Sequence, residues 1–295
     1  MHVIDLPSSL DYRAVDAVLD AAAGAAGKAL FDARHVRFVD PCGMLALLAA
    51  GSRLGDPSGE RPRLQLPDQA DVLGYAARMG FFGAAEGVFE MDGRPPRRAA
   101  GESDVLLEIT PIATNSDVHE IVDRVQARAG QILSRTLRYP TSAVVQFSVI
   151  LSEVCQNIIE HAEAPGWVAA QAYRWQKRLG RWVLVIGVSD LGRGFRGSLA
   201  QEHSARFGDR WGDATALEAA FIHGLTRFPD SGRGQGIQQI RKQVRRWDGV
   251  ISIRSGRARI ADVPAWEEAP PLTDGMQDFP GTEIAIILPG RADDE

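Results

Sequence analysis

The sequence predicts two folded parts joined by a linker. Residues 1–92 are expected to form an α/β domain, because short β-type runs alternate there with helical patterns. Residues 105–292 are expected to form an α+β two-layer sandwich, a mixed sheet with helices on one face. That part opens with two helical patterns and continues with strands among further helices. Residues 93–104 are rich in Pro, Gly and Arg without an apolar period, which predicts a linker.

In the first part, the elements follow from the spacing of apolar residues. The helix expected at 11–23 places Val15, Val18 and Leu19 on one stripe. The remaining expected elements are strands at 2–6, 28–32 and 63–66 and helices at 42–54 and 70–79.

In the second part, Asn115 or Ser116 is expected to cap a helix that reaches about residue 137. Further helices are expected at 143–161, 213–224 and 236–247, and strands at 105–109, 167–173, 182–189, 250–255 and 283–288. Residues 196–231 are long and mixed in pattern. Residues 261–280, rich in Pro and acidic residues, are expected to form a surface loop.

Composition excludes several classes of protein. Of 295 residues, 45% are hydrophobic and 24% charged, as in soluble globular proteins, and the net charge of −5 argues against a general binder of nucleic acid or anionic membrane. Cys42 and Cys155 are far apart and predict neither a disulfide framework nor a thiolate metal site. No apolar run approaches the roughly 18 residues of a membrane span, and no basic start precedes an apolar core. We therefore expect a cytoplasmic protein.

The first motif lies on the 143–161 helix. Residues four apart fall on one side of a helix, so Glu153, Asn157 and His161 form a polar line. The adjoining stripe, expected to pack on the sheet, is Phe147, Leu151, Val154 and Ile158. An Asn carbonyl oxygen suits Mg²⁺, and a Glu can polarise a water or accept a proton. An ordinary amphipathic helix with a polar flank is the alternative.

The second motif ends the apolar strand at 182–189. Asp190 is followed by Gly192 and Gly194, which permit a tight turn close to a ligand. The same residues, continued to Gly197, also fit the G-x-G-x-x-G pattern of dinucleotide sites. We disfavour that interpretation because Asp190 would face the pyrophosphate, and because the residues after Gly197 do not predict a long amphipathic helix.

The third motif is rich in glycine and opens the 236–247 helix. Backbone N–H groups at Gly234 and Gly236, with the positive end of the helix, favour phosphate, and Arg233 adds a charge. The P-loop pattern is absent from the sequence, and a glycine hinge is the alternative. Gly281 and Thr282 form the last motif, directly before the final strand.

In this order, the four segments resemble the N, G1, G2 and Gly-Thr boxes of the GHKL ATP-binding family, which has the Bergerat fold. The resemblance implies ATP and Mg²⁺ as ligands. It implies a base in Glu153, a magnesium ligand in Asn157 and adenine contacts in Asp190 and Thr282. It also implies that Gly192 and Gly194 shape the base pocket, that residues 196–231 form a lid and that His161 supports the pocket. The implied phosphate-binding residues are Arg233, Gly234 and Gly236.

Residues 1–92 resemble a STAS domain, as found in anti-sigma factor antagonists. The residues that carry the resemblance are 30–44, which include Asp40-Pro41-Cys42-Gly43, and 72–82. In regulatory STAS domains this turn contains a phosphorylated hydroxyl residue next to Gly. Because Pro41 and Cys42 have no hydroxyl, we expect a docking or structural module rather than a phosphorylated one.

The expected function is that of an ATP- and Mg²⁺-binding regulatory protein that acts with another protein as partner. We expect a slow ATPase or a serine/threonine kinase of the anti-sigma type. The alternative is a non-catalytic, ATP-dependent switch. Glu153 favours the enzyme, whereas the turn without a hydroxyl favours the switch. A histidine kinase is disfavoured because the helices before the N box contain only His119 as a candidate phosphoacceptor.

Overall fold

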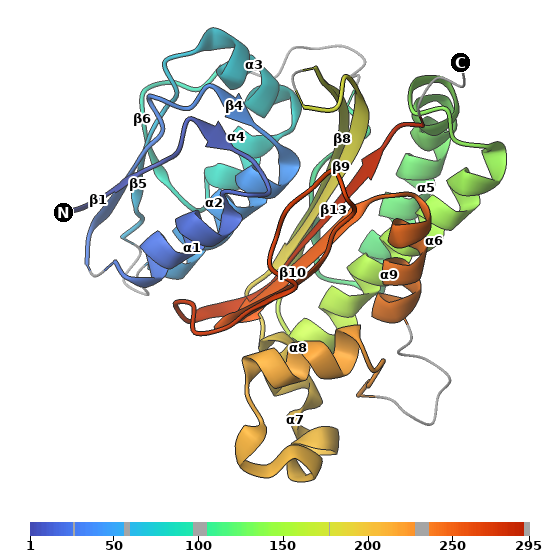
Figure 1. Cartoon of the computed structure of the whole chain (residues 1–295). Coiled ribbons are helices and arrows are strands. Elements are labelled where there is room, and N and C mark those ends of the chain that lie inside the picture. The colour runs from blue at the N-terminus through green and yellow to red at the C-terminus, as the bar shows by residue number, and fades with distance from the viewer. Residues whose placement is uncertain (26, 56–59, 97–104, 177, 228–235, 292–295) are drawn as a thin grey trace.

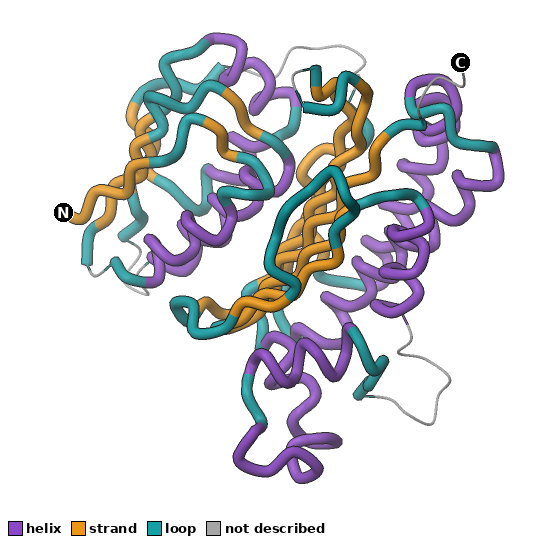
Figure 2. The backbone as a smooth tube through the Cα atoms, in the orientation of Figure 1, coloured by secondary structure: helices purple, strands orange, loops and turns teal. Residues whose placement is uncertain are grey.

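The structure, a computed structural model, describes all residues except 26, 56–59, 97–104, 177, 228–235 and 292–295; the side chains of 127, 129–131, 141 and 161 are also outside the description. The described residues form a mixed α/β protein with a four-stranded parallel sheet, a seven-stranded antiparallel sheet and a two-stranded parallel sheet (Figures 1 and 2). The four-stranded sheet has the order β1-β3-β5-β6, and the seven-stranded sheet has the order β12-β11-β10-β13-β9-β8-β7.

The first sheet is parallel throughout and packs against helices that share its core. Its strands are β1 (His2–Asp5), β3 (Ala29–Asp32), β5 (Arg63–Gln65) and β6 (Glu90–Asp92). The helices are α1 (Val15–Ala23), α2 (Pro41–Leu54), α3 (Ala70–Arg78) and α4 (Phe81–Ala85), and β2 (Ser9–Leu10) pairs with β4 (Phe38–Val39). The sequence did not predict β2, β4, β6 and α4, since runs of two to five residues are too short to show a period.

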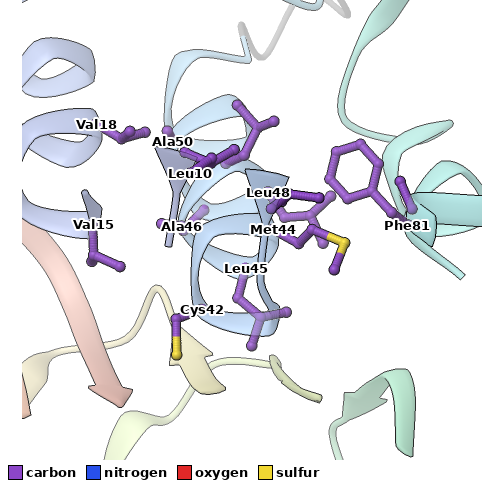
Figure 3. Packing of buried hydrophobic residues seen from close by; sticks show 14 of the residues in the cluster. Leu10, Val15, Val18, Cys42, Met44, Leu45, Ala46, Leu48, Ala50 and Phe81 are labelled. Atoms are coloured by element: carbon purple, nitrogen blue, oxygen red, sulfur yellow. The ribbon is translucent and has the colours of Figure 1, made fainter. Parts of the chain in front are cut away.

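Helix α2 is buried on every side, as expected of a helix that is apolar all round. Asp40 caps its first turn by accepting a hydrogen bond from the Gly43 amide at 2.8 Å. Figure 3 shows Val15 and Val18 on one side of α2 and Phe81 on the other, while Cys42 points toward the strands of the second sheet.

The second sheet is antiparallel at every described pairing, so the prediction of a mixed sheet was wrong. Its strands are β7 (Leu107–Ile112), β8 (Gly166–Trp175), β9 (Arg181–Asp190), β10 (Val250–Gly256), β11 (Ala258–Asp262), β12 (Leu272–Thr273) and β13 (Phe279–Pro289). Apolar runs identified the strands but carried no information about their relative direction. Strands β11 and β12 also occupy part of the region expected to be a loop.

The helices of this part are α5 (Asn115–Gln131), α6 (Thr141–Asn157), α7 (Gly194–Phe207), α8 (Asp213–Phe221) and α9 (Gly236–Arg246). Helices α5 and α6 continue into the π-helical segments η1 (Ile132–Thr136) and η2 (Ile158–Ala162), and the 3₁₀ turn η3 (Gly208–Arg210) follows α7. Before α5, the Asp117 carboxylate accepts from the Thr114 amide at 2.7 Å. The cap therefore lies at Thr114 rather than at Asn115 or Ser116.

Both faces of the second sheet are covered. Within residues 105–292 the helices pack on one face, as the sequence predicts, and the other face is covered by the first part. Helices α5, α6 and α9 lie on one face, and α1 and α2 approach the other (Figure 1). Along β9, Val183 and Val185 belong to the core shared with the first part, while Leu184 and Ile186 belong to the helical core. Adjacent strand residues point to opposite faces, so the unbroken apolar run of β9 is the sequence signal for this double burial.

Ion pairs and close backbone contacts join the two parts. Arg254, only 3% exposed, pairs with Asp16 and Asp20 of α1. A Cβ added to Gly187 of β9 would lie 3.1 Å from the Cα of Cys42. The 40–43 turn is therefore pressed against the sheet, and Cys42 is 3% exposed.

One segment of the described residues, Ser142–Glu160, is long and apolar enough to cross a membrane by length and composition alone, although the sequence analysis predicts no span. Its side chains Phe147, Leu151 and Val154 are buried in the helical core against the sheet. Core helices of soluble proteins pass the same test.

Candidate functional site

A cavity of about 440 Å³ opens beside the C-terminal half of α6. Its walls come from α6, from the starts of α7 and α9, and from the ends of β9 and β13. It is lined by residues of all four sequence motifs, namely Glu153, Asn157, Asp190, Gly194, Gly236 and Thr282. The fold therefore brings together segments that lie far apart in the sequence.

The first and third motifs meet where α9 begins. A Cβ added to Gly236 would lie 2.4 Å from Oε2 of Glu153, so only a residue without a side chain leaves this carboxylate where it is. Gly236 is the first residue of α9, and the amides of a first helical turn have no partner within the helix. A carboxylate and a helix N-terminus thus share one end of the cavity.

The second and fourth motifs meet through Gly281 and Asp190. Gly281 has φ +83°, and a Cβ there would lie 1.9 Å from the carbonyl oxygen of Asp190. Thr282 is paired with Asp190 in the sheet register. The Asp190 side chain accepts a hydrogen bond from the Gly192 amide at 2.8 Å. Burial raises the pKa of this carboxyl to about 6, although hydrogen bonds from Gly192 and Thr282 oppose the rise.

Two further glycines hold the turn after Asp190. A Cβ on Gly192 would lie 2.1 Å from the Ala162 carbonyl oxygen, so this turn packs against the end of η2. Gly194 has φ +62° and lies against the hydroxyl of Ser255. That hydroxyl accepts from the Phe195 amide at 2.9 Å and donates to the Gly281 carbonyl at 3.1 Å. Gly194 lines the cavity, whereas Gly192 lies behind it as packing.

The polar side chains along α6 do not all find hydrogen-bond partners among the described residues. The side-chain nitrogen of Asn157 is buried and has no hydrogen-bond partner among the described residues. Partial burial raises the pKa of the Glu153 carboxyl, and the nearby Glu160 adds to the rise. His161 is placed by its backbone in η2.

The structure describes only part of the predicted phosphate-binding motif and lid. Arg233 and Gly234 lie outside the described residues. Of the predicted lid, residues 196–227 are described and contain α7, η3 and α8, so much of it is helical. Within α8, Phe221 is 1% exposed and packs in the helical core.

Several lining residues were missed by sequence reasoning. They are Ser152, Gln156, Phe195, Ser198, Leu199, Leu225 and Thr226, among others. Phe195 could have been found, because it directly follows Gly194 of the second motif. Leu225 and Thr226 gave no signal, since they reach the cavity only through the turn after α8.

The segment from Gly192 to Gly197 fits the pattern of a dinucleotide site but does not have the topology of one. A helix, α7, does follow the G-x-G-x-x-G pattern, contrary to our expectation. Even so, the pattern fails on topology, because β9 is paired antiparallel with both β8 and β13. A dinucleotide site of this type requires parallel strands in a βαβ unit.

The described residues contain no group of three or more His, Cys, Asp or Glu side chains able to hold a metal ion. A cation here would need ligand oxygens from a bound molecule and water besides Asn157, as is usual for Mg²⁺ beside phosphates. The cavity therefore combines a buried acceptor in Asp190, the Asn157 side-chain amide without a hydrogen-bond partner among the described residues, the Glu153 carboxylate with its raised pKa, and a helix N-terminus.

No protein-family model matches the chain, and no curated protein matches its sequence.

Proposed function

We propose that the chain is an ATP- and Mg²⁺-binding regulatory protein. The observation that carries the proposal is the single cavity in which residues of four separate motifs meet, held by close glycine contacts at Gly192, Gly236 and Gly281. At Gly192 and Gly281 the nearest atom is a backbone oxygen, so sterics require glycine there. At Gly236 the absence of a side chain keeps the Glu153 carboxylate in place, which weakens the alternative of a simple hinge.

Adenine would occupy the end of the cavity formed by β9 and β13. There the Asp190 carboxylate would accept a hydrogen bond from the exocyclic amino group, and Thr282 would share the contact. Val188, Ile284 and Phe195 provide apolar surface beside them. A buried, ionised acceptor of this kind discriminates strongly between ligands that can donate a hydrogen bond to it and ligands that cannot.

The phosphates would lie toward Gly236 and the start of α9. The roles of Arg233 and Gly234 rest on the sequence motif alone. Asn157 would supply an oxygen to Mg²⁺, and its unsatisfied amide fits a polar ligand. Bound there, the magnesium nucleotide would supply a γ-phosphate for hydrolysis or transfer. Glu153, whose raised pKa makes it a better proton acceptor, would take the proton of the attacking water or hydroxyl.

The leading reaction is therefore slow ATP hydrolysis, or phosphorylation of a serine or threonine on a separate protein. We assign residues 105–292 to the GHKL family and 1–92 to the STAS-like class as part of this proposal. The helices α5, α6 and α9 on one face of the second sheet and the alternating β and α elements of the first part support it.

The alternative is a non-catalytic switch that changes its affinity for a partner protein on binding ATP. One observation favours it. The 40–43 turn lacks a hydroxyl and is buried against β9, so the first part offers no phosphate acceptor there to a neighbouring kinase.

Calorimetric titration with MgATP tests the binding itself. We expect saturable binding to the unmodified protein and loss of at least about tenfold in affinity for Asp190→Asn, which keeps the shape but removes the charge. Absence of binding to the unmodified protein would overturn the proposal. Incubation with γ-labelled ATP then separates the reactions, because released phosphate indicates an ATPase, label on a co-purified protein indicates a kinase, and binding with neither indicates the switch.

A further inference from the structure

Helix α6, the middle helix of its layer, leaves an apolar stripe in solvent. Val145 is 67% exposed and Val149 is 51% exposed, and they lie four residues apart on one side of the helix. The surrounding segment is apolar enough to cross a membrane, yet only 44% of it is buried. Single exposed valines are common, so the stripe alone does not identify a partner.

The two neighbouring helices carry opposite charge on their outer sides. On α5, Glu120 and Asp123 are exposed, while Arg124 turns away to pair with Glu108 at 2.9 Å. On α9, Lys242 and its neighbours Arg245 and Arg246 are exposed. Neither Asp123 nor Lys242 has an ion-pair partner among the described residues. The valine stripe is thus bordered by an acidic edge and a basic edge.

Two hydrogen bonds fix the relative heights of these charges. Gln156 of α6 bonds to Asn115 at the start of α5, at 3.0 Å. Gln243 of α9 bonds to Gln146 of α6, also at 3.0 Å. Gly236 at the start of α9 also lies against Glu153 near the end of α6, as Asn115 at the start of α5 lies near Gln156, so both outer helices run antiparallel to α6.

Equal rise along each helix then places Asp123 and Lys242 at about the height of the two valines, on opposite sides of them.

We propose that two copies of this chain associate through the face formed by α5, α6 and α9, about a two-fold axis parallel to α6. That axis places the valine stripes of the two copies against each other. It also sets α5 of each copy against α9 of the other, so Asp123 faces Lys242 of the second copy. A two-fold axis across the helices would instead oppose acid to acid and base to base, which the charges disfavour.

The size of the face suits such an interface. Helices α5 and α6 have 17 residues each, which corresponds to a length of about 25 Å. Three helices at spacings near 10 Å span about 30 Å. The product, about 750 Å², is close to the roughly 800 Å² that each partner buries in a standard interface.

Sedimentation equilibrium of the full chain over a wide concentration range provides the first test. We expect a monomer–dimer equilibrium whose dissociation constant rises at least about tenfold in Val149→Glu. Val3→Glu is the matched control, because Val3 is 48% exposed on β1, away from this face, and should leave the equilibrium unchanged. Thermal unfolding of each variant verifies that the fold is retained.

A charge exchange tests the axis. Asp123→Lys and Lys242→Glu should each weaken the dimer, and the double variant should restore it, because the attraction is then re-formed with reversed signs. An unmodified protein that is monomeric at every concentration, or a double variant no better than the singles, would overturn the proposal. A monomer that instead sediments with phosphatidylcholine vesicles through Val149 would reassign the stripe to a membrane surface, against our proposal.

Discussion

Gly236 lies against Glu153 so closely that any side chain at position 236 would meet the carboxylate, with a Cβ 2.4 Å from Oε2. The atom in the way is the far end of a flexible side chain, so the carboxylate can move aside and the fold can survive. The contact therefore constrains the position of Glu153 more than it constrains folding.

Gly236→Ala should leave stability nearly unchanged while it impairs the site. Alanine favours the helix by up to about 1 kcal/mol over glycine, which offsets the local crowding. We expect any phosphate release from ATP to fall at least about tenfold, because the carboxylate is displaced from its place. Urea unfolding and phosphate release measure the two effects. Gly83→Ala in α4, where no atom lies within 4 Å of an added Cβ, is the control and should affect neither.

Gly281→Ala should damage the fold itself. The added Cβ would lie 1.9 Å from the backbone oxygen of Asp190, which cannot rotate away as a side chain can. We expect a loss of about 3 kcal/mol or more in the free energy of unfolding. Gly275 also has positive φ, at +77°, but open space around it. Gly275→Ala should therefore lower the free energy of unfolding by only about 1–2 kcal/mol, the cost of a left-handed backbone conformation for alanine. Equal losses in the two variants would contradict the steric account.

Ligand affinity should depend on the ionisation of Asp190. Its pKa is raised to about 6 by burial, so the carboxylate is fully available as an acceptor only well above that pH. The ratio of MgATP affinities between unmodified protein and Asp190→Asn should be constant near neutral pH and should shrink as pH falls through about 6. Titration of the nucleotide affects both proteins equally and therefore cancels in the ratio. Calorimetry at several pH values measures the two affinities. A ratio that is flat with pH would separate Asp190 from ligand recognition.

Arg254 should stabilise the contact between the two parts of the protein. It is 3% exposed and pairs with Asp16 and Asp20 across the interface. Without Arg254, Asp16 keeps its ion pair with Arg259 at 3.0 Å and Asp20 is 35% exposed, so no buried charge is left unpaired. The cost is that of the lost charge-assisted hydrogen bonds, about 1.5–3 kcal/mol. Arg254→Met should lower the free energy of urea unfolding by that order. The exposed pair of Lys28 and Glu60 is the comparison, and Lys28→Met should cost less than about 1 kcal/mol.

Asp40 should make the fold less stable at high pH. Burial raises the pKa of its carboxyl to about 7, above the ordinary Asp value of 3.8 that applies to the unfolded chain. The folded state therefore holds its proton more tightly, and its contribution is fully present below about pH 4 and is lost as pH rises through about 7. Urea unfolding of unmodified protein and Asp40→Asn should diverge across this window, with the unmodified protein losing more. Parallel curves would show that Asp40 does not titrate there.

Much of the element order was predictable because apolar periodicity is a local property. The α6 stripe of Phe147, Leu151 and Val154 and the helix start at Gly236 were confirmed in this way. The grouping of Glu153, Asn157, Asp190 and Thr282 was a prediction from motif order, and the cavity now places these residues together. Helix α7 was missed because its apolar residues are few and do not recur at helical spacing, so the segment shows no clear stripe.

By itself, the sequence determined where most helices and strands form and which side chains could carry chemistry, since both depend on residue type and short-range spacing. Only the tertiary structure decided the antiparallel order of the second sheet and the burial of the 40–43 turn against Gly187. It also decided which glycines are required by close contact. These features depend on which distant backbone segments touch, and residue spacing along one chain does not encode that directly.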